Sequence, residues 1–166
     1  MVIRPPTPAD YPVIAEVVTS AFLTADHASG TEADVVERAR AEGAVLVELV
    51  MEDDGEIVGH VMLSRMRTDR PLFVAGLGPV AAAPGRQSQG IGSLLVRRGL
   101  DDCRALGVDA VIVLGHPAYY PRFGFSAEAA ANIASPFAGR PSFMAMELTP
   151  GALTAPLKAD YPAAFD

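Results

Sequence analysis

The chain has 166 residues, a formal net charge of −7 at pH 7, and half of its residues are hydrophobic. This length suits one domain with its own core, and no apolar run approaches the length of a membrane span. The acidic balance argues against broad nucleic-acid binding and is compatible with an amine substrate. The single cysteine, Cys103, excludes an intramolecular disulfide and a cysteine-based zinc cluster, and Arg4-Pro5-Pro6 interrupts any signal-like segment. We therefore expect a cytoplasmic protein that binds no metal, no membrane and no nucleic acid.

The N-terminal part predicts one short strand and two helices. Val2–Arg4 is β-rich, and Thr7 is placed to cap a helix whose apolar residues recur at helical spacing until Phe22. A polar turn at residues 24–30 separates it from a second helix, expected from about Thr31 to Arg40.

Three apolar stretches then predict an antiparallel meander. They cover residues 44–51, 57–64 and 72–82, and Asp54-Gly55 has the composition of a hairpin turn. Glu48 is the only charged residue of its stretch. An isolated carboxylate there predicts an Arg or Lys partner, or an outward position at a sheet edge.

Residues 77–96 form a strand, a turn and the beginning of a helix. Pro84-Gly85 breaks the strand, and Gln87-Ser88-Gln89-Gly90-Ile91-Gly92 opens the helix. Helix N-termini have unpaired N–H groups and partial positive charge, and glycines let a phosphate approach the backbone. The spacing fits neither a P-loop nor a dinucleotide fingerprint, so the pattern indicates another anion site, suited to pyrophosphate.

A second constellation follows the next strand. Gly107 ends the helix, and the nearly continuous apolar run 109–115 predicts a buried strand parallel to its neighbour. Directly after it comes Gly115-His116-Pro117, and Tyr120 stands four residues before Gly124-Phe125. Residues 142–148 predict the final strand, and the aromatic residues of the tail predict that it docks on the body or on a second subunit.

Together, Gln87-x-x-Gly90-x-Gly92 and Tyr120-x-x-x-Gly124-Phe125 resemble the signatures of the GCN5-related N-acetyltransferases (GNAT). More narrowly, residues 116–125 and the late strand resemble the YhbS-type acetyltransferases, and the likeness covers nearly the whole chain. It implies an α/β fold with a mixed, mostly antiparallel central sheet and helices on both faces. It also implies one domain over residues 1–166, with 149–166 as a docked C-terminal tail.

The resemblance implies direct transfer of an acetyl group from acetyl-CoA to a primary amine. The pantetheine arm would pair with the edge of a strand, an N–H near Val80 would polarise the thioester, and the glycine loop would hold the pyrophosphate. The implied cofactor-binding residues are Val80, Ala81, Ala82, Gln87, Ser88, Gln89, Gly90, Ile91, Gly92 and Ser93.

Two residues are implied for proton transfer. Tyr120 matches the tyrosine of the family and would protonate the departing thiolate, although aromatic core packing is the alternative. His116 is placed to act as the base, although it departs from the polar residue common at this position and a structural histidine is the alternative. Glu48 and His60 are weaker candidates for the base.

Several points stay open at this level. Asp26 and His27 would lie on the acceptor side in the resembled family, but a solvated turn is the alternative. A catalytically silent acyl-CoA-binding module and a transferase using another acyl-CoA remain alternatives to acetyl transfer. The acceptor amine and a possible homodimer are also undetermined.

Overall fold

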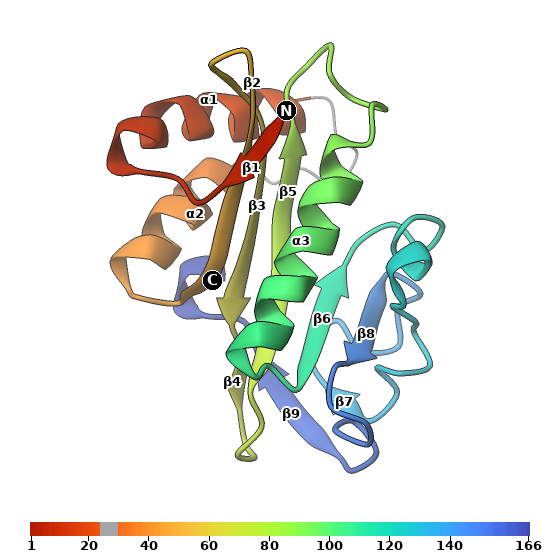
Figure 1. The fold of residues 1–166 in the computed structure, drawn as a ribbon. Helices are drawn as coiled ribbons and strands as arrows, with labels where there is room; N and C mark the ends of the chain where they lie inside the picture. Colours follow the sequence, from red (N-terminus) through yellow and green to blue (C-terminus); the bar gives the residue numbers. More distant parts are fainter. Residues whose placement is uncertain (24–29) are drawn as a thin grey trace.

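The computed structural model describes residues 1–23 and 30–166, which form a central six-stranded sheet (Figure 1). Its order is β1-β2-β3-β5-β6-β8, and only the contact between β5 and β6 is parallel. This confirms the mixed, mostly antiparallel sheet. The strands are β1 (Val2–Arg4), β2 (Val45–Asp53), β3 (Glu56–Arg65), β5 (Val74–Ala82), β6 (Ala110–Leu114) and β8 (Phe143–Glu147).

Helices cover both faces of the sheet, as expected. Helices α1 (Tyr11–Phe22) and α2 (Glu32–Ala41) lie on one face, and α3 (Ile91–Leu106) lies on the other (Figure 1). The short 3-10 turn η1 (Pro8–Asp10) precedes α1, and the carboxylate of Asp10 accepts a hydrogen bond of 2.7 Å from the backbone N–H of Thr7. This bond explains why the chain enters α1 at the predicted place.

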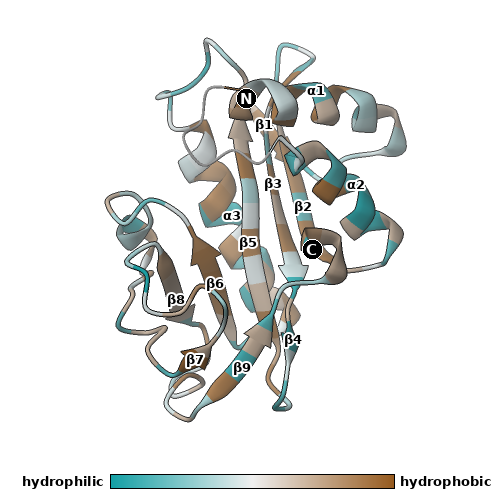
Figure 2. Ribbon diagram, turned by 180° about the vertical axis from the view of Figure 1, so that it is seen from behind, coloured by the Kyte–Doolittle hydropathy of each residue, from teal (hydrophilic) through white to brown (hydrophobic). Residues whose placement is uncertain are grey.

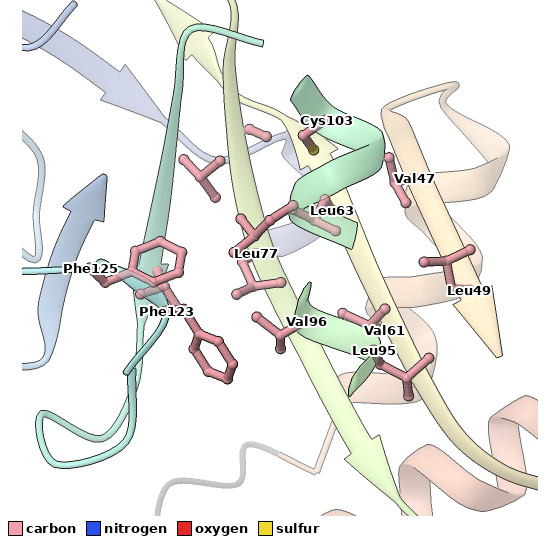
Figure 3. Close-up of a cluster of buried hydrophobic side chains, with 14 of the residues drawn as sticks. Val47, Leu49, Val61, Leu63, Leu77, Leu95, Val96, Cys103, Phe123 and Phe125 are labelled. Atoms are coloured by element: carbon pink, nitrogen blue, oxygen red, sulfur yellow. The ribbon is translucent and has the colours of Figure 1, made fainter. Parts of the chain in front are cut away.

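Helix α3 is anchored by one apolar stripe. Leu95, Val96 and Cys103 point into a cluster with Leu63 and Leu77 of the sheet (Figure 3). Burial raises the pKa of the Cys103 thiol to about 12, so the cysteine is a neutral packing residue. The N-terminus of α3 is therefore held in place relative to β5. None of the helices in the described residues is long and apolar enough to cross a membrane.

The tail corrects one expectation, because β8 is not the final strand. Strand β9 (Leu157–Asp160) pairs antiparallel with β4 (Arg67–Thr68) and parallel with β7 (Ile133–Ala134). Leu157 and Ala159 are buried with Ile133 in a second apolar cluster, and η3 (Ala163–Phe165) follows. Two- to four-residue strands are too short for a periodic signal, so only their long-range partners define them.

The position of the site follows from a bulge in β5. Val61 lies opposite Val80 and Leu63 lies opposite Leu77, so β5 has one extra residue at Gly78-Pro79. The parallel pairing with β6 ends at the same point, with Leu77 opposite Val113. Beyond it the two strands diverge (Figure 1). A bulge bends its strand and increases the local twist, which accounts for the divergence.

Candidate active site

The divergence of β5 and β6 opens a cavity of about 1020 Å³. Its middle is formed by residues 77–82 of β5, residues 114–116 after β6, and Tyr120. Gln87 lies at one end, while parts of α1, α2 and the tail form the rest of the wall. The predicted strand edge, Tyr120 and His116 therefore line one continuous space.

The open edge of β5 presents backbone groups to this cavity. The N–H of Ala83 donates to the carbonyl of Val58 on β3 at 2.9 Å, and the register continues with Ala82 opposite Gly59. Because backbone groups alternate in an antiparallel ladder, those of Ala82 and Val80 point away from β3 toward the diverging strand. The groups of Ala81 point toward β3, so this residue lines the cavity only as part of its wall.

The loop before α3 and the first turn of this helix supply unpaired donors, and Gln87 of this loop lines the cavity. Within the described chain, the backbone N–H groups of Gln87 to Ser93 donate to no protein acceptor. Gly90 has a φ of 80°, in the left-handed region, and is exposed. Glycine adopts this conformation without strain, and the loop can then turn its amides toward one point. These groups fit an anion such as pyrophosphate.

Arg86 holds this loop, and the sequence patterns did not identify it. Its guanidinium donates to Asp53 at 2.6 Å and to the side-chain oxygen of Gln89 at 3.1 Å. This contact lowers the pKa of the Asp53 carboxyl. The loop is thus tied to the β2–β3 hairpin, but an arginine beside a glycine is too common in sequences to predict such a link.

Tyr120 lines the cavity from the 3-10 turn η2 (Tyr120–Phe123). Its ring packs edge-on against Phe125 at 5.9 Å between centroids and lies against Gly115, which has no space for a Cβ. Burial raises the pKa of Tyr120 to about 12, so the phenol stays protonated at neutral pH. Its hydroxyl makes no hydrogen bond with the described residues. Tyr120 therefore packs in the core and also presents a neutral proton donor.

The neighbouring Tyr119 connects the two halves of the site. Its hydroxyl lies 2.8 Å from the hydroxyl of Ser93 in the first turn of α3. No sequence pattern pairs these residues, which come from different elements.

His116 follows β6 and lines the cavity, as predicted, with an exposed side chain. Its backbone carbonyl accepts hydrogen bonds from the N–H groups of Tyr119 and Tyr120, at 3.0 and 3.3 Å. The backbone carbonyl of His116 thereby orients the turn that carries both tyrosines. Asp26 and His27 lie outside the described residues.

Glu48 and His60 form a separate buried cluster. Glu48 accepts hydrogen bonds from Arg40, one of them at 3.0 Å, and lies 2.8 Å from Nε2 of His60. The arginine partner expected for Glu48 is therefore confirmed. Neither residue lines the cavity. Among the described residues, no group of three or more His, Cys, Asp or Glu side chains is arranged to hold a metal ion.

Solved structures define the class of this fold. A GNAT family acetyltransferase from Brucella melitensis, in complex with acetyl-CoA, is 32% identical with a TM-score of 0.84, covering 99% of this chain and 97% of that one. The GNAT family N-acetyltransferase YhbS from Escherichia coli, in complex with CoA, is 31% identical with a TM-score of 0.87, covering 99% and 91%. The fold of the chain is thus that of the GNAT family acetyltransferases.

Sequence comparison gives the family. The model of the Acetyltransferase (GNAT) family matches residues 14–125. The chain is 36% identical over 127 residues to the uncharacterized N-acetyltransferase YhbS of Escherichia coli K12, covering 75% of this chain and 73% of YhbS. It is 37% identical over 116 residues to the uncharacterized N-acetyltransferase YjhQ of the same strain, covering 68% of this chain and 62% of YjhQ. The chain belongs to the GNAT family and is similar to YhbS.

Proposed function

We propose that the protein transfers an acetyl group from acetyl-CoA directly to a primary amine. The observation that carries this proposal is the junction of a free strand edge with a loop whose backbone N–H groups are unpaired. The edge of β5 at Val80 and Ala82 lines the cavity, and so does Gln87, the first residue of the loop whose N–H groups stay unpaired up to Ser93. The first set suits an extended arm with amide groups, and the second suits a pyrophosphate.

The co-substrate would supply an acetyl group activated as a thioester. The N–H of Val80 is placed to donate to the carbonyl oxygen as negative charge develops on it. The edge of β5 would align the reacting carbonyl with the incoming amine, which lowers the entropic cost of the reaction. No nucleophile of the protein is needed, because the amine attacks the carbonyl carbon itself.

Two proton movements accompany the transfer of the acetyl group. The C–N bond forms as the C–S bond breaks, the amine loses a proton and the thiolate gains one. We assign the second proton to Tyr120, whose hydroxyl is protonated and exposed to the cavity. We assign the first to His116, directly or through water, because its side chain lines the same cavity.

Calorimetric titration with acetyl-CoA tests the cofactor site. Gly92 has room for a Cβ, which would lie 3.5 Å from the Tyr119 hydroxyl and 3.6 Å from Val80. Gly92→Glu therefore places a carboxylate at the anion site without backbone strain. We expect affinity to fall about 100-fold or more, because like charges at close range cost several kcal/mol. Ala105→Glu, exposed at the other end of α3, is the matched control and should bind as the wild type does.

The titration, together with assays of CoA release, separates the alternatives. Absence of binding by folded wild-type protein would overturn the proposed function. Binding without release of free CoA in the presence of any amine would favour a silent acyl-CoA-binding module. Faster transfer from propionyl-CoA or succinyl-CoA than from acetyl-CoA would favour another acyl donor.

A further inference from the structure

The far part of the cavity is lined by the C-terminal tail. Ala159, Asp160 and Tyr161 lie there together with Phe165, and Phe137 approaches from the loop before β8. In the view of Figure 2, the tail and η3 lie on the face of the sheet that α1 and α2 also cover. This wall is therefore on the opposite side of the sheet from α3.

Aromatic rings make this wall rigid. The ring of Tyr161 packs edge-on against Phe137, with 6.0 Å between centroids, and lies 5.2 Å from Phe165. A Cβ at Gly76 would lie 3.0 Å from the Tyr161 ring, so the glycine lets the ring rest on β5. Rings held in this way offer flat apolar surface with little loss of entropy on binding.

Tyr161 also brings a polar group into the cavity. Its hydroxyl makes no hydrogen bond with the described part of the chain. Burial raises the pKa of this phenol, and the nearby Tyr120 raises it further. Tyr161 is thus neutral at physiological pH and has donor and acceptor capacity left for a ligand beside the proposed acid.

The charge of this part of the cavity is negative. Asp160 and Asp166 line it, and the carboxylate of Asp160 forms neither an ion pair nor a hydrogen bond within the described residues, with Arg67 opposite it in the β4–β9 pair. The lining cation Arg67 donates two hydrogen bonds, of 3.0 and 2.6 Å, to the backbone carbonyl of Tyr161. Its guanidinium is thereby directed toward the tail backbone.

We propose that the acceptor is a cationic primary amine on an aromatic or other apolar arm, without a carboxylate. Asp160 attracts the ammonium group, and Phe137, Tyr161 and Phe165 contact the arm. This inference depends on the proposed acetyl transfer, whose strand edge at Val80 and Ala82 lines the same cavity. The net charge of −7 would also favour the approach of cations.

The wall should discriminate between an amine and the corresponding amino acid. An additional carboxylate on the acceptor would face Asp160, and Arg67, which lies opposite Asp160 in the β4–β9 pair, has two of its N–H groups on the Tyr161 carbonyl. Like charges brought together in a binding site repel each other, which disfavours the wrong partner. Tryptamine and tryptophan are a matched pair of probes, since they differ only in this group.

The test is calorimetric binding of each probe to the protein saturated with CoA, which prevents turnover. We expect wild-type protein to bind tryptamine at least about 10-fold more tightly than tryptophan. Asp160→Asn should weaken tryptamine binding about 10-fold and reduce the discrimination, as expected when one partner of a charge pair is neutralised. Tyr161→Leu should weaken tryptamine binding through loss of the ring. Glu128→Gln, an exposed acid outside the cavity, should bind as the wild type does.

The outcomes distinguish this inference from the proposed function. Equal or tighter binding of tryptophan, no binding of either probe, or unchanged tryptamine binding by Asp160→Asn would overturn the inference while CoA still binds. If CoA itself does not bind, the proposed function fails and the inference fails with it. Unchanged CoA affinity in Asp160→Asn and Tyr161→Leu would show that both variants are folded.

Discussion

The hydroxyl of Ser93 lies 2.8 Å from the hydroxyl of Tyr119. Ser93 is in the first turn of α3, and Tyr119 precedes η2 after β6. The bond thus connects the glycine loop to the turn that carries Tyr120. It gives the two halves of the site a fixed separation at the edge of the cavity.

This link predicts an energetic coupling. Ser93→Ala and Tyr119→Phe should each lower the free energy of unfolding by about 1 kcal/mol, the usual net value of one hydrogen bond. The double variant should cost less than the sum, because the second substitution has no bond left to remove. Chemical denaturation of the four proteins measures the coupling. Strict additivity would show that the hydroxyls do not interact.

Tyr120→Phe should reduce the rate of acetyl transfer and leave acetyl-CoA affinity unchanged. Loss of a positioned acid typically costs about 100-fold to 10,000-fold in rate. Since burial raises the pKa of Tyr120 to about 12, the phenol is protonated below that pH. The wild-type rate should therefore show no loss from its ionisation between pH 6 and about pH 10. Steady-state kinetics of Tyr120→Phe and Tyr119→Phe provide the comparison, and an unchanged kcat for Tyr120→Phe would exclude the acid role.

His116→Gln should lower kcat and leave acetyl-CoA affinity unchanged. Glutamine keeps a polar side chain but cannot accept the proton of the amine. The backbone carbonyl that orients Tyr119 and Tyr120 is retained in this variant. Steady-state kinetics and calorimetric titration of both proteins are the measurements. If His116→Gln keeps the wild-type kcat, the base is another group.

Gly115→Ala should lower kcat through the position of Tyr120. A Cβ at this site would collide with the Tyr120 ring, which must then move. We expect a loss of rate approaching that of Tyr120→Phe. The double variant should be no slower than Tyr120→Phe alone, because the hydroxyl that Gly115→Ala displaces is already absent in Tyr120→Phe. Kinetics and thermal unfolding of all three proteins decide this, and a Gly115→Ala enzyme with wild-type kcat would contradict it.

The cluster of Arg40, Glu48 and His60 should set part of the acid stability. Burial opposes ionisation of Glu48, but hydrogen bonds from His60 and Arg40 outweigh it and lower the pKa below the ordinary value of 4.5. A depressed pKa in the folded state stabilises the protein fully above the unfolded-state value, and this contribution is lost as pH falls through the folded-state value. The free energy of unfolding should therefore fall below about pH 4.5.

Glu48→Gln is the matching variant. It removes the charge between Arg40 and His60, so unfolding should become easier by about 3 kcal/mol near neutral pH. The part of the acid dependence that Glu48 causes should disappear. Chemical denaturation between pH 3 and 7 would show both effects. If the free energy of unfolding of Glu48→Gln falls with decreasing pH as steeply as that of the wild type, carboxyl groups other than Glu48 cause the acid dependence.

Local sequence determined the elements and the two motifs. Helix caps, turn residues and apolar periodicity depend on neighbours along the chain, so α1, α3, β2, β3 and β6 appeared near their predicted places. The loop at Gln87–Gly92 and the turn at Tyr120 were visible for the same reason. Each requires particular residue types at short spacing, glycine above all where a backbone must approach an anion.

Tertiary structure alone decided which groups meet. The tail strand β9 exists because Leu157 and Ala159 bury against residues far away in the chain, and four residues carry too little periodicity to reveal it. The Tyr161 wall and the Ser93–Tyr119 bond likewise join distant segments. Such contacts are selected by the burial and hydrogen bonding of the whole fold, and no local pattern records them.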